Sequence, residues 1–386
     1  MKKELIFSKI IHRIKRVLNK KEAQLHEPTL SKNVLINLEK CVKTNMLSSV
    51  GPFVTKFENM IQEYTGSKFA IATVNGTSAL HISLILSGIK QSNEVILPAV
   101  NFIASANAIS YLGGRPIFAD IDDSTLGLDV DKLKFFLKEN TYQSSKNCIN
   151  KKTHNVIKGI IVLHTFGHPA KIDELLKLSK DYNISLLEDS AEALGSEYFG
   201  QHVGTFGKFG ILSFNGNKII TTGGGGMILT NSKELAYKAY HISRTAKINH
   251  PWKYIYDQVG YNYRMPNINA SIGCAQMENI DDLIRKKRLL FERYQEEFLN
   301  IKDAFIFKEP KNCKSNYWLQ CLIFKKNNKK YLEEFIKKCH SKNLFVRPLW
   351  ELTNLLKHFK VFQKDSLRNS YKIYKNLVNL PSSSFL

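Results

Sequence analysis

Lys218 lies in a stretch that could carry covalent chemistry on an amine. Ser213 precedes it, and the four consecutive glycines 223–226 follow it. A site for pyridoxal 5′-phosphate (PLP) needs these features: an amine for the aldehyde, a hydroxyl for the phosphate, and a compact backbone nearby. The competing interpretation is a surface lysine followed by a turn, since most lysines are solvated and glycine runs are common in turns. If the lysine is functional, the stretch predicts amino-group chemistry.

Carboxylates stand just after a short apolar run, residues 184–187. The run predicts a strand, and Asp189 follows its end, where ligands bind in open α/β sheets. A buried carboxylate there can keep the pyridine nitrogen of PLP protonated, which makes the ring an electron sink. The alternative for Asp189 is the N-cap of a helix, a common role of aspartate.

A third segment, residues 70–81, predicts a strand, a turn and an amphipathic helix. The backbone amides of Gly76, Thr77 and Ser78 would lie at the start of that helix. Together with two hydroxyl groups they would form a site suited to a phosphate. A helix with an ordinary cap is the alternative.

Together and in this order, these segments resemble the DegT/DnrJ/EryC1/StrS family of PLP-dependent sugar aminotransferases. The resemblance covers residues 26–386 and implies fold-type I, the aspartate aminotransferase-like class of α/β fold. The likeness is greatest to the LegC group, whose members aminate C4 of a nucleotide-linked 4-keto-6-deoxy-N-acetylhexosamine. It rests on residues 26–28, 48–51, 75–80, 164–169, 213–226, 260–270 and 379–383.

The resemblance implies a role for each matching residue of the cofactor site. Lys218 would bind the PLP aldehyde as a Schiff base and then move a proton between the substrate carbon and the cofactor. Asp189 would pair with the pyridine nitrogen, and Phe102 would stack on the ring, although a core phenylalanine is the alternative. The residues expected at the phosphate are Gly76, Thr77, Ser78, Ser213 and, from a neighbouring subunit, Asn262. The active site would therefore lie at the interface of a homodimer.

Glu192 departs from the broad family pattern, in which many members carry Gln or His near the phenolic O3′ of the cofactor. Because an ionised carboxylate would repel a phenolate, we expect Glu192 to be protonated, turned away or paired with a cation. The LegC group shares this glutamate. Arg264 and Arg347 lie in stretches similar to the family's nucleotide-sugar pocket and are candidates for binding the substrate, with surface ion pairs as the alternative.

The resemblance predicts a ping-pong transfer from L-glutamate through PLP to a UDP- or GDP-linked keto sugar. The product would serve the synthesis of legionaminic acid or a related surface-glycan sugar. Family members that act as sugar dehydratases carry histidine in place of the lysine, so Lys218 favours aminotransfer. A dehydratase or a 3-keto-sugar aminotransferase stays an alternative. A basic nucleotide- or nucleic-acid-binding protein is the alternative from outside the enzymes.

Length and patterning agree with an enzyme built on a parallel sheet. The 386 residues, 43% of them hydrophobic, can bury a large core. Apolar runs such as 94–97 and 159–163 alternate with helical stretches, which favours parallel strands covered on both faces. We expect a polar surface loop at 139–158, and an amphipathic link at 268–299. The expected organisation is an N-terminal segment 1–37, a PLP-binding domain 38–265 and a small α/β domain 266–386.

The formal net charge of +22 would attract anions. No nucleic-acid-binding motif accompanies the charge, so we expect no nucleic acid as partner and attribute the excess mainly to a lysine-rich composition. Residues 2–21 predict a basic amphipathic helix that either packs on its own protein or lies on an anionic membrane. We expect a cytoplasmic protein, since no run is long and apolar enough to span a membrane. The six cysteines lack metal-binding spacing, so no metal is expected.

Overall fold

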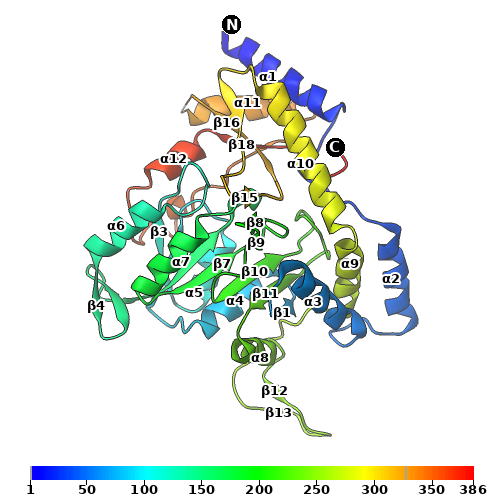
Figure 1. Cartoon of the computed structure of the whole chain (residues 1–386), viewed down its shortest axis with the longest axis vertical. Coiled ribbons are helices and arrows are strands. Elements are labelled where there is room, and N and C mark those ends of the chain that lie inside the picture. The colour runs from blue at the N-terminus through cyan, green and yellow to red at the C-terminus, as the bar shows by residue number, and fades with distance from the viewer. Residues whose placement is uncertain (1, 327) are drawn as a thin grey trace.

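The computed structural model describes residues 2–326 and 328–386, and its largest element is a nine-stranded sheet (Figure 1). Seven strands form its main path. In spatial order they are β1 (Phe69–Thr73), β11 (Gly226–Thr230), β10 (Phe209–Ser213), β7 (Ser185–Asp189), β6 (Val156–Leu163), β2 (Glu94–Pro98) and β3 (Arg115–Ala119). The pairs from β10 to β3 are parallel, whereas β11 is antiparallel to both its neighbours. This confirms the predicted, mostly parallel sheet.

Helices cover both faces of this sheet. On one face are α4 (Gly76–Leu86), α5 (Ala104–Tyr111) and α8 (Lys233–Ile242), and on the other are α6 (Val130–Asn140) and α7 (Ile172–Asp181). Alternation along β6 explains the two layers: Ile161 packs with the first group, and Ile160 and Val162 pack with the second. The strands are therefore apolar on both faces, as the sequence indicated.

A second, four-stranded sheet lies beside the large one. Its order is β14 (Ala304–Ile306), β16 (Gln320–Phe324), β18 (Leu377–Leu380) and β17 (Arg347–Pro348), all antiparallel. It shares a core with α10 (Ile280–Phe298) and α11 (Lys329–His340). The remaining helices are α2 (Lys32–Lys43), α3 (Pro52–Thr65), α9 (Asn267–Met277), α12 (Arg368–Tyr374) and the 3₁₀ helices η1 (Thr165–Gly167) and η2 (Thr353–Leu355). The domain boundaries at residues 37 and 265 stay a prediction.

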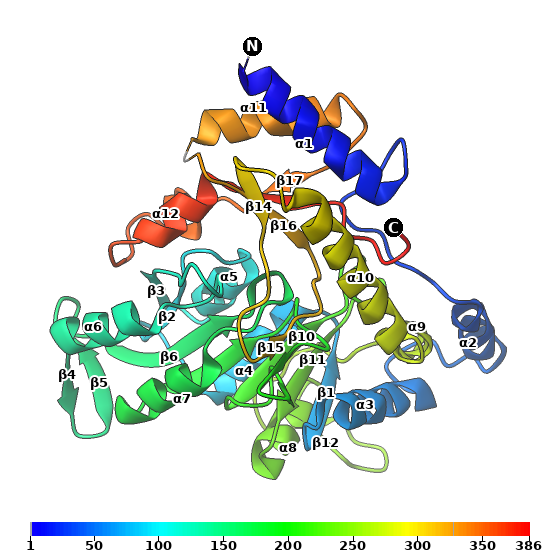
Figure 2. The same ribbon diagram turned by 45° about the horizontal axis from the view of Figure 1, so that its top comes forward.

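The basic N-terminal helix, α1 (Lys2–Leu18), packs on its own chain, next to α10 and α11 (Figure 2). Phe7, Ile10 and Ile14 on its apolar face are at most 1% exposed and join the core of the small sheet. At its edge, Arg13 donates to Glu297 across 2.8 Å. The apolar face that membrane insertion would need is thus buried in the protein.

Two local expectations are corrected by the structure. Residues 139–158 do not form a loop, because β4 (Thr141–Ser144) and β5 (Asn147–Asn150) make a hairpin that extends the large sheet from β6. Cys148 on β5 is fully buried, which gives this polar segment its anchor in the core. The stretch 268–299 is helical but breaks between α9 and α10.

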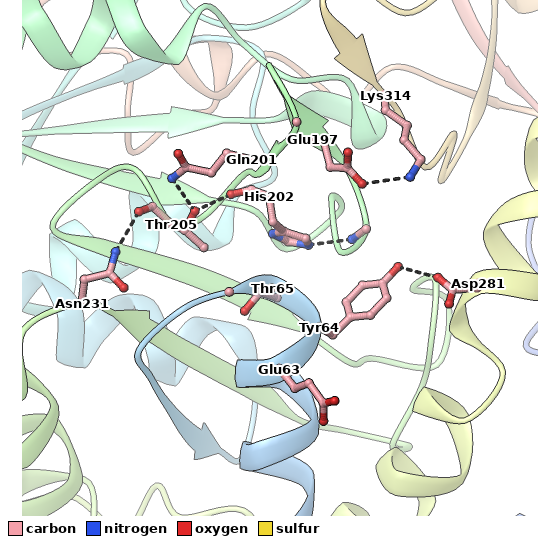
Figure 3. A pocket seen from close by; sticks show the side chains of 13 residues that line it. Glu63, Tyr64, Thr65, Glu197, Gln201, His202, Thr205, Asn231, Asp281 and Lys314 are labelled. Carbon is pink, nitrogen blue, oxygen red and sulfur yellow. Dashed lines mark hydrogen bonds and ion pairs between the residues drawn. The ribbon is translucent and has the colours of Figure 1, made fainter.

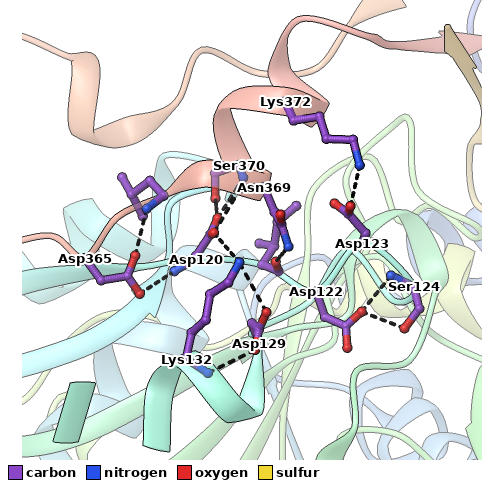
Figure 4. Close-up of polar contacts among 12 residues, drawn as sticks. Asp120, Asp122, Asp123, Ser124, Asp129, Lys132, Asp365, Asn369, Ser370 and Lys372 are labelled. Atoms are coloured by element: carbon purple, nitrogen blue, oxygen red, sulfur yellow. Dashed lines mark hydrogen bonds and ion pairs between the residues drawn. The ribbon is translucent and has the colours of Figure 1, made fainter. Parts of the chain in front are cut away.

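A network of charged groups joins the C-terminal segment to the end of β3 (Figure 4). The buried Asp120 accepts hydrogen bonds from the backbone N–H of Ser370 at 2.7 Å and of Asn369 at 2.9 Å, and from Lys132 Nζ at 2.6 Å. Asp365 in turn accepts from the backbone N–H of Asp120. These bonds fix α12 against the large sheet.

A hairpin of β12 (Lys247–Ile248) and β13 (Ile255–Tyr256) projects away from the body of the molecule (Figure 1). Trp252 and Tyr254 at its tip are 77% and 78% exposed. The three-stranded sheet of β8 (Glu197–Tyr198), β9 (Gln201–His202) and β15 (Cys313–Lys314) completes the fold. Among the described residues, none of the helices combines the length and the apolar character required to cross a bilayer.

Candidate active site

A cavity of about 220 Å³ opens at the carboxyl ends of β7 and β10. Ligands bind at this edge in open α/β sheets. Seven residues expected from the sequence line the cavity together: Gly76, Thr77, Phe102, Asp189, Glu192, Ser213 and Lys218. The fold therefore brings together residues separated by up to 142 positions in the chain.

The two adjacent carboxylates at the end of β7 point in different directions because strand side chains alternate. Glu188 is fully buried and accepts hydrogen bonds from the backbone N–H groups of Gly204, Phe206 and Gly207. His164 Nε2 lies 3.1 Å from the same carboxyl group. Glu188 thus has a structural role, and Asp189 is the carboxylate that faces the cavity.

Asp189 is held in place by two hydrogen bonds. Its Oδ2 accepts from Ser105 Oγ at 2.7 Å, and its Oδ1 accepts from the backbone N–H of Ala191 at 3.2 Å. Burial raises the pKa of this carboxyl group, and the hydrogen bonds oppose the shift. A buried carboxylate gains most from a cationic partner, so Asp189 is suited to bind a protonated ring nitrogen.

Lys218 extends from the loop after β10 into the same cavity. Its Nζ lies 3.3 Å from Glu192 Oε1 and 4.0 Å from the centre of the Trp318 ring. The indole N–H of Trp318 donates to the carbonyl of Asn217 across 2.6 Å, which fixes the backbone just before the lysine. The surface-lysine interpretation is wrong, because the Lys218 side chain is only 12% exposed.

Glu192 lies between the lysine and the backbone of η1. Its Oε2 accepts from the N–H of Phe166 at 2.9 Å. Burial raises the pKa of Glu192, and the nearby Lys218 opposes the shift. Of the three arrangements expected for this glutamate, the structure shows the one in which it is paired with a cation.

The opposite end of the cavity is formed by the start of α4 and the end of β10. Gly76, Thr77 and Ser213 line it, and their backbone and hydroxyl groups suit a phosphate. The chain comes close here because a Cβ at Gly226 would lie 2.4 Å from the carbonyl carbon of Asn75. This close contact explains why the last residue of the glycine run, Gly226, has to be a glycine.

Ser78 differs from the expectation for this end of the cavity. Its backbone N–H donates to the side chain of Asn75 at 2.8 Å, so the cap of α4 uses the amide expected to bind phosphate. Ser78 instead lines a neighbouring hollow, with Thr77, His81 and Tyr263.

Aromatic side chains form the wall of the cavity. Phe102 is 51% exposed and lines the cavity, so the core alternative for this residue is wrong. Its ring lies 6.1 Å from that of Trp350, which packs on Phe166 at 4.9 Å. Sequence reasoning missed Trp318, which comes from a segment 100 positions after Lys218. No spacing signal links the two residues, and only the fold brings them together.

Besides Ser78, three more expected residues do not line the cavity in this chain. Asn262 is exposed and pairs with Arg244 in an isolated bridge. Arg264 is half-buried, and burial lowers the pKa of its guanidinium, which the nearby Glu58 opposes. Arg347 lies on β17 and is exposed.

Another hollow, of about 480 Å³, lies between the end of α3 and the β8–β9 hairpin (Figure 3). Its polar side chains bind one another: Lys314 pairs with Glu197, and Tyr64 donates to Asp281. None of the residues expected to be functional lines it. We therefore place the candidate active site in the smaller cavity, where lysine, buried carboxylates and aromatic rings meet.

The smaller cavity fits PLP by the chemistry of its groups. It offers an amine, a buried carboxylate, an exposed aromatic ring, and a hydroxyl with a helix start at the far end. The sheet order and the position of the cavity define a PLP-dependent transferase of fold-type I.

Comparison with known proteins defines the family. The model of the DegT/DnrJ/EryC1/StrS aminotransferase family matches residues 28–386. GDP-perosamine synthase of Escherichia coli O157:H7 is 38% identical over 299 residues, which are 78% of this chain and 77% of that protein. A UDP-4-amino-4,6-dideoxy-N-acetyl-beta-L-altrosamine transaminase of Campylobacter jejuni is 32% identical over 262 residues, 68% of this chain and 65% of that protein.

Solved structures agree in fold. The aminotransferase TlmJ of Streptoalloteichus hindustanus superposes with a TM-score of 0.85 at 24% identity, over 94% of each chain. The PLP form of the putative sugar aminotransferase Spr1654 of Streptococcus pneumoniae gives 0.84 at 21% identity, over 95% of this chain and 94% of that one. The chain belongs to the DegT/DnrJ/EryC1/StrS family. It is a PLP-dependent nucleotide-sugar aminotransferase. The helix α1 lies before the residues that the family model matches.

Proposed function

We propose that the enzyme transfers an amino group from L-glutamate to C4 of a nucleotide-linked 4-keto-6-deoxy-N-acetylhexosamine. The resulting amino sugar would serve the synthesis of legionaminic acid or a related surface-glycan sugar. The observation that carries the transfer is the meeting of Lys218, Asp189 and Glu192 in one cavity. The LegC-like stretches of the sequence carry the choice of sugar.

When bound, PLP supplies an aldehyde that takes up the amino group and a ring that withdraws electrons from the reacting carbon. Asp189 would bind the ring nitrogen, and Phe102 would pack on the ring. Thr77 and Ser213 would bind the phosphate, with Gly76 at the start of α4. Glu192 would lie near the phenolic oxygen. Lys218 would bind the aldehyde and, once free, move the proton at the substrate carbon.

We also propose that two chains share their active sites in a homodimer. Asn262 is exposed and lies outside its own cavity, as expected of a residue that reaches the phosphate in a neighbouring subunit. The projecting β12–β13 hairpin carries exposed aromatic residues, and such a surface is typical of an interface. Arg264 and Arg347 would bind the nucleotide sugar.

The direct test is product analysis after incubation of the enzyme with PLP, L-glutamate and a keto sugar. UDP- and GDP-linked 4-keto-6-deoxy-N-acetylglucosamine are supplied separately, and mass spectrometry detects an amine in place of the ketone. Lys218→Ala is the control and should lose both turnover and the visible absorbance of bound PLP. Retention of both by this variant would contradict the assignment of the lysine.

A second acceptor is favoured by the relatives. Three of them, between 31% and 38% identical, are named GDP-perosamine synthase. A GDP-linked 4-keto-6-deoxyhexose without the acetamido group is therefore the alternative substrate. Conversion of this sugar, but of neither N-acetylated one, would replace the first acceptor and leave the transfer chemistry unchanged.

A further inference from the structure

Lys218 must leave the cofactor in every reaction cycle, because the amino group and the lysine cannot both occupy the same aldehyde carbon. The chain alone shows where the free side chain lies. Its Nζ stands between the Glu192 carboxylate, 3.3 Å away, and the face of the Trp318 ring, 4.0 Å from its centre. A carboxylate attracts an ammonium by its charge, and among aromatic rings the indole face attracts it most strongly.

The two groups that contact the lysine are themselves fixed. Glu192 is 3% exposed and is held by the N–H of Phe166. Trp318 is also 3% exposed, and its backbone N–H donates to the side-chain oxygen of Asn316 at 2.8 Å. The Asn316 amide group donates to the carbonyl of Glu192 at 2.9 Å, so one residue joins the two walls.

A second, buried lysine holds the backbone of Trp318. Lys287 on α10 is fully buried, and its Nζ donates to the carbonyl of Trp318 at 3.0 Å and to that of Ser382. Burial lowers the pKa of Lys287 well below its usual range. Trp318, just before β16, is therefore tied to α10 and to the C-terminal segment, whereas Glu192 lies in the segment that follows β7.

We propose that Glu192 and Trp318 form a docking site that holds the free side chain of Lys218 beside the cofactor between the two halves of the reaction. This inference rests on the proposed function, because it requires that Lys218 alternate between a linked and a free form. The site stabilises only the free form. It therefore favours the pyridoxamine phosphate state of the enzyme over the PLP state, in which the lysine has left the site.

The site also explains the glutamate at position 192. A glutamine offers no charge to the ammonium, whereas a carboxylate in this buried place does. The other titratable groups around the pair are Asp189, Cys321 and His26. Of these, only Asp189 shares the cavity.

The experiment compares the affinities of the cofactor-free enzyme for PLP and for pyridoxamine phosphate. Binding of PLP removes Lys218 from the docking site, and binding of pyridoxamine phosphate does not. Loss of the site should therefore raise the ratio of the pyridoxamine phosphate Kd to the PLP Kd. We expect about a tenfold rise for Glu192→Gln, which removes one charged hydrogen bond, and about threefold for Trp318→Phe.

The ratio separates this role from other roles of the same residues. A contact of Glu192 with the phenolic oxygen is common to both cofactor forms, so its loss cancels in the ratio. Glu197→Gln is the matched control, because that carboxylate pairs with Lys314 outside the cavity, and its ratio should equal that of the wild type. Trp318→Phe tests the same point if Glu192→Gln does not fold.

Two failures are distinguishable. Borohydride reduction of the wild-type enzyme with PLP should label Lys218, as found by peptide mass spectrometry, and absence of this label would contradict the proposed function itself. If Lys218 is labelled but neither variant changes the ratio by more than twofold, the docking site is refuted.

Discussion

The contact between the C-terminal segment and the large sheet depends on one buried carboxylate, that of Asp120. We predict that Asp120→Asn weakens the packing of this segment on the sheet. Asp120 Oδ1 accepts from both the N–H and the hydroxyl of Ser370 at 2.7 Å. Its Oδ2 accepts from Lys132 Nζ at 2.6 Å and from the N–H of Asn369 at 2.9 Å. An asparagine keeps the first oxygen but places an NH₂ group against the last two donors.

The loss follows from these contacts. The hydrogen bond from the Asn369 amide to a buried charge contributes about 2 kcal/mol. Lys132 is 31% exposed and can turn toward Asp129 or water, so the loss of its ion pair with Asp120 destabilises the segment by only about 1 kcal/mol. The sum of about 3 kcal/mol corresponds to about a hundredfold more frequent local opening of this segment.

Hydrogen exchange with mass spectrometry measures this opening directly. The peptide that covers residues 365–374 should exchange about a hundredfold faster in Asp120→Asn, whereas a peptide from α4 should not change. Asp123→Asn is the matched control, because its partner Lys372 is half-exposed and the pair contributes little. Exchange in Asp120→Asn within threefold of the control would refute the reasoning.

The pH dependence has a definite sign. Burial alone would raise the pKa of Asp120, but the hydrogen bonds from Lys132 and Ser370 bring it below the usual value of 3.8. Because the folded pKa is lower than the unfolded one, the stabilisation is present above about pH 4 and is lost as the pH falls through the folded pKa. The difference in melting temperature between wild type and Asp120→Asn should shrink over that acid range.

Three further predictions concern the active site, the interface and the N-terminal helix. Asp189→Asn should lower kcat by about two orders of magnitude and weaken PLP binding. Ser105→Ala, which removes one hydrogen bond to Asp189, should lower kcat far less. Equal effects of the two substitutions would argue against a role of the charge. Inactive Lys218→Ala and Asn262→Ala chains, mixed and allowed to exchange subunits, should regain about a quarter of wild-type activity, and no recovery would refute the shared site. Because Ile14 is fully buried, Ile14→Ala should destabilise α1 by about 3 kcal/mol. Hydrogen exchange over residues 2–18 should then be faster, and an unchanged rate would show that the helix does not depend on this packing.

Local sequence was sufficient to predict the main strands and the helix around the candidate site. The apolar runs at 94–97 and 159–163 lie within β2 and β6, and the run at 184–187 overlaps β7, since buried parallel strands have a clear signature. The segment 70–81 became β1 and α4. The hairpin of β4 and β5 was missed because its residues are mostly polar, and two of its three buried side chains, Thr141 and Asn150, are polar as well.

The sequence by itself was enough to predict the lysine, the carboxylates and the glycines of the candidate site, because their order along the chain is a family pattern with a chemical reason. Only the tertiary structure decided which carboxylate faces the cavity, since Glu188 and Asp189 differ by one step of a strand. It also decided that Asn75 uses the Ser78 amide and that Trp318 covers Lys218. Contacts between distant segments depend on packing geometry, which no local pattern of residues records.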